Sequence, residues 1–303
     1  MTRFTKRILN FQKKSSTEKL RSYVYRWRRW FRDTPAPIRL STGSWWLLDT
    51  DFIGESLLSG GYERAEQDFA HRFLKAGMTV IDIGAHRGFH TLFFSKKVGK
   101  RGHVISFEPS LRDRKRLELH LKINFCRNVE LRDCALGEEE GSASLYVVRV
   151  NSVLNSLRPP DTPQESFPTP VPMRKLDDVL SQAQLDRIDF IKLDVEGGEL
   201  GVLKGAERLL QRIPRPVILC EVVEQRTRPW GHPGRLVIEH LSQRGFVWFE
   251  LNACGELLLF PDGRSEFNGN FVAVPNESLK TLEHLRSRAH HSFNTQASRE
   301  SHA

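Results

Sequence analysis

The sequence predicts an α/β fold, a Rossmann-like, doubly wound and mostly parallel sheet preceded by a basic helical arm. Three observations support this prediction. A short apolar run enters a glycine-spaced turn at residues 80–88, strand-like and helix-like segments alternate after it, and basic residues are concentrated in the first part of the chain. Alternating strands and helices are typical of a parallel sheet covered by helices. A chain of 303 residues with 39% hydrophobic content can form one principal domain with appendages.

Residues 1–37 are expected to form a basic, partly disordered arm with an amphipathic helix. Residues 1–32 contain eleven Lys and Arg but one Glu, a net charge of +10, whereas the whole chain carries +9. Within this segment, apolar residues recur at three- and four-residue steps, as they do on one helix face: Leu20, Tyr23, Val24, Trp27, Trp30 and Phe31. Such a face most often docks on protein, on this chain or a second subunit. The alternative is peripheral contact with an anionic membrane through residues 17–32.

The charge distribution argues against a nucleic-acid substrate. Residues 33–303 sum to −1, whereas enzymes that modify nucleic acids usually carry basic residues around the active site. The sequence shows neither the ~18 consecutive apolar residues of a membrane span nor the apolar core of a secretion signal. Its four cysteines are widely spaced, which disfavours a zinc site and suits a reducing compartment. We expect a cytoplasmic protein, with contact at the inner membrane surface as the alternative.

Residues 38–275 are expected to form the principal domain. A hairpin at residues 38–40 and 45–48 and a helix over 62–76 precede the first sheet strand. The pattern then predicts strands at 79–83, 103–108, 128–136, 144–150, 188–193, 216–222, 246–251 and 270–274, and helices at 89–97, 111–123, 201–211 and 233–244. Residues 276–303 are expected to form a C-terminal helix and a flexible tail.

The sequence Asp82-Ile-Gly84-Ala85-His-Arg-Gly88 predicts a cofactor cradle between a strand and a helix. Glycine lets the backbone approach a ligand closely because it has no Cβ. Only two glycines fall in this motif, whereas the dinucleotide fingerprint uses three to seat a pyrophosphate. The spacing is the one expected for S-adenosylmethionine (SAM), which has no phosphate and carries a positive sulfonium.

Acids near the ends of the next two strands extend the predicted cofactor site. Glu108 lies 26 positions after Asp82, at the end of the second strand. A carboxylate in this position can accept hydrogen bonds from two ribose hydroxyls. Asp133 lies near the end of the third strand, where it either accepts from the adenine amino group or serves in a turn.

In these residues the chain resembles the FkbM-type SAM-dependent methyltransferases, over residues 38–275. The resemblance also rests on Phe107-Glu108-Pro109, on Ala135-Leu136-Gly137 and on Lys192-Leu-Asp194-Val-Glu196-Gly-Gly. It implies a class I methyltransferase fold, SAM as cofactor and hydroxyl acceptors on carbohydrates or secondary metabolites. The cofactor residues implied are Glu66, Asp82, Gly84, Ala85, Gly88, Glu108, Asp133 and Ala135. His86 departs from the family, in which Asn is usual.

Asp194, Glu196 and Glu221 are the predicted catalytic residues of a SAM-dependent O-methyltransferase. Methyl transfer to an alcohol needs alignment of the acceptor and benefits from a base that takes the hydroxyl proton. Asp194 and Glu196 follow a buried strand and would share a face if the strand continued. Glu196 has the alternative role of a helix cap, and Glu221 that of a structural acid. No metal is predicted, because the histidines at positions 86 and 90 have no evident third ligand.

Residues 155–172 contain six prolines. Because proline lacks the backbone N–H donor, we expect this segment to form neither a helix nor a central strand. The segment is expected to be either a lid over the acceptor or a linker. Two other functions remain open: a non-catalytic SAM-binding scaffold, and an NAD-dependent oxidoreductase, which the missing third glycine disfavours. The expected partner is a small-molecule or glycan hydroxyl acceptor.

Overall fold

The computed structural model describes residues 16–31, 34–59, 61–149, 151–181, 184, 188–260, 264 and 266–287. These residues belong to two compact units, which divide after residue 63. The domain boundary after residue 37 stays a prediction. Residues 1–15, at the start of the arm, and 288–303, in the expected tail, lie outside the described residues.

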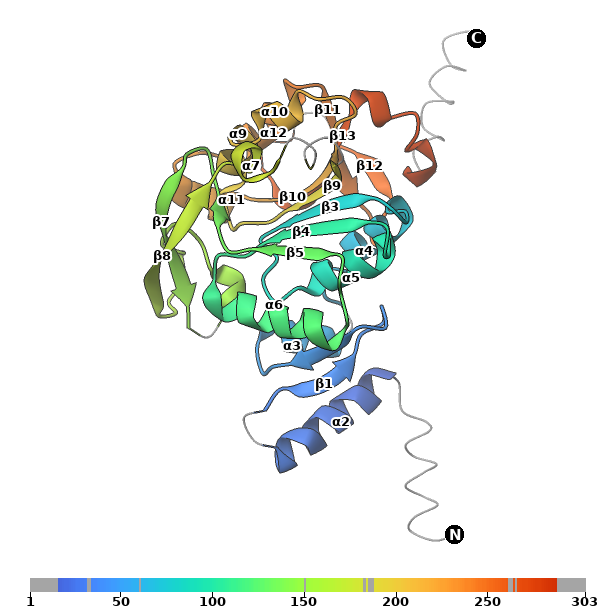
Figure 1. The fold of residues 1–303 in the computed structure, drawn as a ribbon, viewed down its shortest axis with the longest axis vertical. Coiled ribbons are helices and arrows are strands. Elements are labelled where there is room, and N and C mark those ends of the chain that lie inside the picture. Colours follow the sequence, from blue (N-terminus) through green and yellow to red (C-terminus); the bar gives the residue numbers. More distant parts are fainter. Residues whose placement is uncertain are drawn as a thin grey trace, which may run out of the picture. The chain divides into compact units, whose positions relative to one another are not determined.

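The first unit contains a helix and a hairpin. Its elements are α2 (Ser16–Trp30), β1 (Ala36–Arg39), β2 (Trp45–Leu48) and α3 (Phe52–Ser59) (Figure 1). The predicted hairpin is present, with β1 and β2 antiparallel. Helix α2 packs on it: Val24 is buried, and the Tyr23 hydroxyl donates to the Pro37 carbonyl at 3.0 Å. One face of α2 therefore docks on its own chain, as the sequence favours.

The second unit is built on an eight-stranded sheet in the order β12-β11-β13-β10-β9-β3-β4-β5. The five strands from β10 to β5 run parallel, and the remaining pairs are antiparallel. The strands are β3 (Thr79–Ile83), β4 (His103–Phe107), β5 (Val129–Arg132), β9 (Ile188–Leu193), β10 (Val217–Val223), β11 (Phe246–Leu251), β12 (Leu257–Leu259) and β13 (Asn268–Pro275). The chain moves outward from β3 to β5 and returns on the other side of β3 at β9. This reversal is the topological switch point at which such sheets bind ligands.

Alternating side chains of β3 face two hydrophobic clusters, one on each side of the sheet. Val80 packs with α4 (Arg64–Phe73) and α5 (Phe89–Val98), whereas Ile81 and Ile83 face the opposite side. There they pack with α7 (Leu176–Val179), α9 (Glu199–Lys204), α10 (Glu207–Leu210) and α12 (Arg235–Ser242). The predicted doubly wound fold is confirmed (Figure 1). No helix among the described residues is long and apolar enough to cross a membrane.

A three-stranded sheet, in the order β6-β8-β7, corrects the prediction for the proline-rich segment. Its strands are β6 (Ala135–Leu136), β7 (Gly141–Val148) and β8 (Ser166–Arg174), and η1 (Ser152–Leu154) follows β7. Strand β8 is central, although it contains Pro168, Pro170 and Pro172. Arg149 donates its backbone N–H to Glu165, so the register places all three prolines at the alternate positions whose nitrogens point away from β7. On the other side of β8, strand β6 pairs only with Met173 and Arg174, which follow the prolines. Neither neighbouring strand therefore needs a backbone N–H from Pro168, Pro170 or Pro172.

Three other predicted elements are divided or replaced in the structure. The strand expected over residues 128–136 is divided into β5 and β6, which belong to different sheets, so that Asp133 lies between them. The helix expected over 201–211 is divided into α9 and α10. In the described part of the C-terminal segment, the 3-10 helices η3 (Asn276–Ser278) and η4 (Glu283–Leu285) replace the expected helix. The remaining helices are α6 (Leu111–Ile123), α11 (Glu224–Thr227) and η2 (Arg228–Trp230).

Gly84→Ala is expected to destabilise the fold more than Gly231→Ala. Both glycines have a positive φ, 81° and 79°, so alanine costs about 1–2 kcal/mol at either position. Only at Gly84 would the new methyl group collide with a neighbour, the Asp194 carbonyl, which adds about 1–3 kcal/mol of overpacking. Gly231 is in the left-handed helical region, and no described atom lies within 4 Å of the position that its Cβ would take. Urea unfolding measures both variants, and equal losses would contradict the close contact at Gly84.

Candidate functional site

The glycine turn lies at the carboxyl end of β3 and is held by the neighbouring strands. The backbone N–H groups of Gly84 and Ala85 donate to the Phe107 carbonyl of β4 at 3.1 and 3.0 Å. Gly88 donates to Ala85 at 2.8 Å and has a φ of 90°. On the side of β9, the Asp194 N–H donates to Ile83 at 3.1 Å. The turn is therefore fixed between β4 and the residue that follows β9.

Asp82 is buried beneath the turn, 1% exposed, on the side of the sheet that α5 covers. Its Oδ2 accepts from the Thr91 hydroxyl at 2.5 Å, and its Oδ1 has no hydrogen-bond partner within the described part of the chain. Burial raises the pKa of Asp82, and the positive charge of Lys192 on β9 opposes that rise. Asp82 is thus joined to α5 through Thr91, with one oxygen left to accept a hydrogen bond, and its role at the cofactor stays a prediction.

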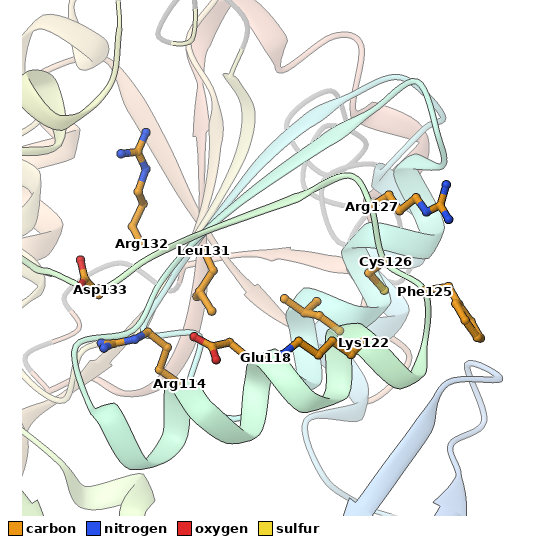
Figure 2. A pocket seen from close by; sticks show the side chains of 10 residues that line it. Arg114, Glu118, Lys122, Phe125, Cys126, Arg127, Leu131, Arg132 and Asp133 are labelled. Carbon is orange, nitrogen blue, oxygen red and sulfur yellow. The ribbon is translucent and has the colours of Figure 1, made fainter.

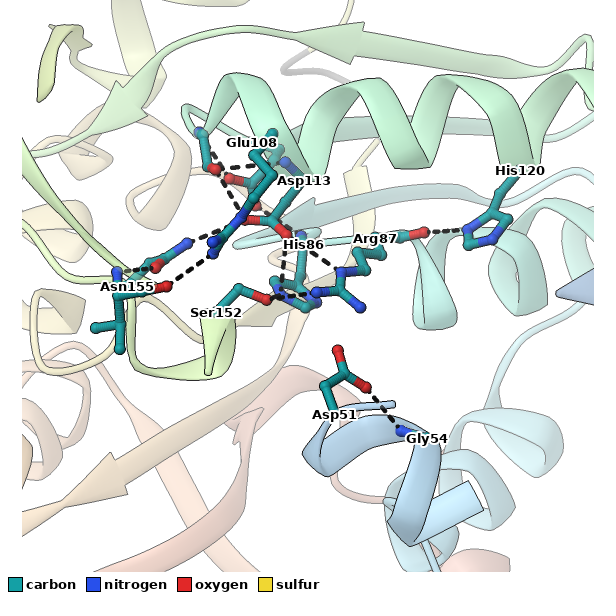
Figure 3. Close-up of polar contacts among 12 residues, drawn as sticks. Asp51, Gly54, His86, Arg87, Glu108, Asp113, His120, Ser152 and Asn155 are labelled. Carbon is teal, nitrogen blue, oxygen red and sulfur yellow. Dashed lines mark hydrogen bonds and ion pairs between the residues drawn. The ribbon is translucent and has the colours of Figure 1, made fainter. Parts of the chain in front are cut away.

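Glu108 projects from the end of β4 toward the turn. Its Oε2 accepts from the His86 N–H at 2.7 Å, and its Oε1 accepts from the Ser110 N–H at 2.8 Å (Figure 3). Burial, followed by the negative charge of Asp113, raises the pKa of Glu108 to about 8. Each carboxylate oxygen has a second lone pair that can accept from a ligand hydroxyl. This geometry suits the ribose role, which stays a prediction.

Asp133 is exposed at the junction of two cavities beside β5. The larger, of about 800 Å³, runs along α6 and is lined at its opposite end by Phe125 (Figure 2). The second, of about 580 Å³, shares Arg132 and Asp133 with it and extends to Cys134. Ala135 is buried in β6. Asp133 is therefore accessible to the adenine ring of a cofactor. A hydrogen bond from the adenine amino group to Asp133 stays a prediction.

Glu66 lies on α4 and contacts the antiparallel strand β13 rather than the glycine turn. Its Oε1 accepts from the Asn270 amide at 2.9 Å, and Asn270 pairs with Glu221 across β10 and β13. Glu66 is therefore connected to the surroundings of the predicted catalytic acids. Sequence reasoning did not select Asn270, which lies 204 residues away along the chain.

The three predicted catalytic acids converge at the ends of β9 and β10. Asp194, Glu196 and Glu221 each offer a carboxylate oxygen, and these oxygens lie within 4.8 Å of one another. Burial and the negative charges of their neighbours raise the pKa of Glu196 and of Glu221 well above the ordinary range. Carboxyl groups that retain a proton near neutral pH are suited to acid–base chemistry. We call these three residues the acid group.

Two cations that sequence reasoning did not select partner the acid group. Arg226 of α11 donates from Nε to Glu196 at 2.8 Å and also forms an ion pair with Glu221. Lys192 of β9 lies with its Nζ 2.9 Å from Asp194 Oδ2. The three acidic oxygens have the spacing of a metal site, but Arg226 already provides a positive charge between two of them.

The prediction that Glu196 shares a strand face with Asp194 is wrong. Strand β9 ends at Leu193, and Glu196 has a left-handed backbone with a φ of 58°. The alternative capping role is not observed either, because Gly198 is the N-cap of α9 and no described side chain caps this helix. Glu199 Oε1 instead holds the preceding loop, where it accepts from the backbone N–H groups of Val195 and Gly197, both at 3.1 Å. A tight loop, rather than strand alternation, brings Glu196 into the acid group.

The comparison with known families decides the assignment. The methyltransferase FkbM domain matches residues 82–258. This chain belongs to the FkbM methyltransferase family. The predicted resemblance is confirmed, and with it SAM as the cofactor that the family and the observed sheet imply.

Individual relatives cover only part of the molecule. Methyltransferase 1 of Beauveria bassiana is 26% identical over 145 residues, which cover 42% of this chain and 58% of the relative. Methyltransferase sdnD of Sordaria araneosa is 29% identical over 168 residues, which cover 46% and 64%. The match thus spans less than two thirds of either relative. Among solved structures, the precorrin-6y C5,15-methyltransferase of Geobacter metallireducens aligns with 70% of this chain and 89% of its own, at 14% identity and a TM-score of 0.40.

The affinity for SAM is expected to increase as the pH rises through about 8. Glu108, with its pKa raised to about 8, is increasingly ionised above that pH, and only the carboxylate accepts from both ribose hydroxyls. Between pH 6.5 and 9 the ionised fraction of Glu108 increases from about 3% to about 90%, so we expect the Glu108-dependent affinity to increase by about 30-fold. Isothermal titration calorimetry across this range measures it.

Glu108→Gln should lose this pH dependence, because a glutamine side chain does not titrate. The SAM amino group titrates equally in the wild type and in the variant, so their difference isolates Glu108. Glu139→Gln, an exposed acid between β6 and β7, is the matched control and should keep the wild-type profile. Identical profiles for the wild type and Glu108→Gln would remove the ribose assignment.

Proposed function

We propose that this protein is a SAM-dependent O-methyltransferase whose acceptor is a hydroxyl of a carbohydrate or a secondary metabolite. One observation supports the proposal above all others. Asp194 is the first residue of the acid group, and its backbone carbonyl lies directly against Gly84 of the glycine turn. An acceptor beside the acid group would therefore be close to a cofactor on the turn. Proton-accepting groups next to the methyl donor suit an acceptor that must lose a proton.

In the proposed reaction, the chain contributes position and proton removal. SAM supplies a methyl group on a positively charged sulfonium, whose sulfur keeps the electron pair of the broken C–S bond. The acceptor oxygen forms the new bond to the methyl carbon, and its proton passes to a carboxylate of the acid group. Alignment can supply up to about 7–11 kcal/mol, and a base typically contributes about 10²–10⁴-fold.

The acid group would act as a coupled unit rather than as three independent acids. Glu196 and Glu221 have raised pKa values, chiefly through burial, while the Arg226 charge opposes the rise in both. One member of the group therefore retains a proton while another is ionised. The apparent pKa values describe the three carboxyl groups together and not any one of them. The proposed base is Glu221, in the state of the group in which Glu221 is ionised and paired with Arg226.

Glu221→Gln is expected to reduce turnover by about 10²–10⁴-fold while SAM affinity stays close to that of the wild type. The glutamine keeps the size of the side chain but cannot take a proton. The measurement is the formation of S-adenosylhomocysteine with a panel of sugars and hydroxylated metabolites, alongside calorimetry with SAM.

Glu139→Gln, at an exposed position between β6 and β7, is the matched control and should retain full turnover. Equal turnover in wild type and Glu221→Gln would exclude Glu221 as the base. A folded wild type that binds SAM but methylates no member of a broad panel would favour the scaffold alternative.

We also propose that the exposed face of α2 contacts an anionic membrane surface. Tyr25 and Trp30 on this face are 72% and 78% exposed. Three exposed arginines, Arg21, Arg26 and Arg29, surround them on the same helix. Arginines interspersed with Tyr and Trp suit the headgroup region of an anionic bilayer, where each basic residue contributes about 1 kcal/mol.

Vesicle co-sedimentation tests this surface. We expect binding to phosphatidylglycerol-containing vesicles that weakens by about 30-fold in the double variant Arg26→Ala/Arg29→Ala, from about 1 kcal/mol for each arginine. Trp30→Ala should weaken it as well. Phe125→Ala, an 82% exposed aromatic of the second unit, is the control and should bind normally. Equal binding to uncharged vesicles, or none to either kind, would contradict the proposal.

A further inference from the structure

Residues 152–158, which we call the strap, contact the glycine turn at one end and the acid group at the other. The strap begins at η1, soon after β7, and precedes the proline-containing strand β8. From the sequence, residues 155–172 are expected only to be a lid or a linker, and Ser152 lies outside that segment. The side-chain contacts of the strap indicate a more specific role.

The first end of the strap holds two side chains of the glycine turn. The Ser152 hydroxyl is buried and lies 2.7 Å from His86 Nε2 (Figure 3). It also accepts from Arg87 Nη2 at 3.0 Å. A single hydroxyl thus connects the strap with the two residues between Ala85 and Gly88.

A buried carboxylate reinforces this end. Asp113 of α6 accepts from the Asn155 amide at 3.0 Å and from Arg87 Nε at 3.2 Å. Burial acts to raise the pKa of Asp113, but the charges of His86, Arg112 and Arg87 and the Ser110 hydroxyl outweigh it and lower the pKa. Asp113 is therefore ionised at neutral pH. Asn155 is also held from its other side, because its Oδ1 accepts from the Val148 N–H at 2.9 Å.

The second end of the strap holds the loop of the acid group. The buried Ser156 hydroxyl donates to the backbone carbonyl of Glu196 at 2.9 Å. Two residues later, the Arg158 guanidinium lies 5.2 Å from the ring centroid of Trp230. Trp230 in turn packs so tightly on the loop that a Cβ at Gly198 would come within 2.9 Å of its ring.

The two residues held in this way share an unusual backbone. His86 and Glu196 have φ values of 51° and 58°, a conformation that residues other than glycine adopt only at a cost. Such conformations persist where the surroundings over-determine them. The strap supplies part of those surroundings at both positions, through Ser152 at His86 and through Ser156 at Glu196.

We propose that Ser152 and Ser156 are positioning residues, through which cofactor binding at the glycine turn orders Glu196. This inference rests on the proposed function of the acid group. Neither serine needs to touch the cofactor or the acceptor, because each acts through the loop that it holds. Loss of either hydroxyl should uncouple the two loops without removing the cofactor site.

Amide hydrogen exchange, with and without SAM, tests the coupling in the full-length protein. In the wild type, SAM should slow exchange in residues 84–90 and also in residues 194–200. In Ser156→Ala, SAM should still slow exchange in residues 84–90, whereas the slowing in residues 194–200 should decrease by about tenfold. Ser152→Ala should show the same separation, because it removes the link at the other end.

Two further variants separate positioning from a general loss of stability. Ser156→Thr keeps the hydroxyl and should restore the wild-type response, whereas Ser144→Ala, at an exposed site on β7, should never lose it. Full slowing of residues 194–200 in both alanine variants would overturn the strap proposal and leave the methyltransferase proposal standing. A wild type that binds SAM with no change in residues 194–200 would overturn it as well. A folded wild type that binds no SAM would instead remove the proposed function.

Discussion

The parallel pairing of β3 with β9 is the constraint on which the site depends. It aligns Ile83 with Leu193, so that the chain leaves both strands at the same edge of the sheet. The Asp194 N–H then donates to Ile83, and the Asp194 carbonyl occupies the space where any side chain at position 84 would begin. The glycine turn and the first two members of the acid group therefore follow two paired strands, β3 and β9. Glu221 is added to them by β10, which pairs with β9 on its other side.

This arrangement brings five acids to one edge of the sheet, and the structure relieves their repulsion in different ways. Asp82 is paired with a threonine hydroxyl, and Glu108 receives two backbone N–H groups. The acid group instead has cations, Lys192 and Arg226. The positive charge of Lys192 also opposes the rise in the pKa of Asp82 that burial causes. The five acids therefore differ in their hydrogen-bond and ion-pair partners, and they need not share one role.

Much of the fold could be predicted from local sequence, because strand and helix patterns repeat over a few residues. The glycine turn, the strands around it and the acids at their ends all follow from spacing along the chain. The residues that were missed depend on distant pairing instead. Arg226 joins Glu196 only because α11 follows β10, and Asn270 reaches Glu66 only because β13 inserts antiparallel beside β10.

Two errors have the same physical origin. Proline was taken to exclude a central strand, but the exclusion holds only where a ladder needs the missing N–H, and β8 places its prolines elsewhere. Glu196 was assigned to a strand face, but strand periodicity ends where the hydrogen bonds of β9 end. Both rules hold only where a strand is hydrogen-bonded to its neighbour. Local sequence does not show which residues are paired in this way.

The departure of His86 from the asparagine usual in the family becomes intelligible in this context. The imidazole Nε2 lies 2.7 Å from the Ser152 hydroxyl and 3.5 Å from Asp113 Oδ1. An asparagine side chain is shorter and would end before either partner from the same backbone position. Through His86, the glycine turn is therefore joined to residues 152–158, which lie outside the parallel sheet. The presence of histidine at position 86 is explained by its contact with Ser152 as well as by the nearby cofactor site.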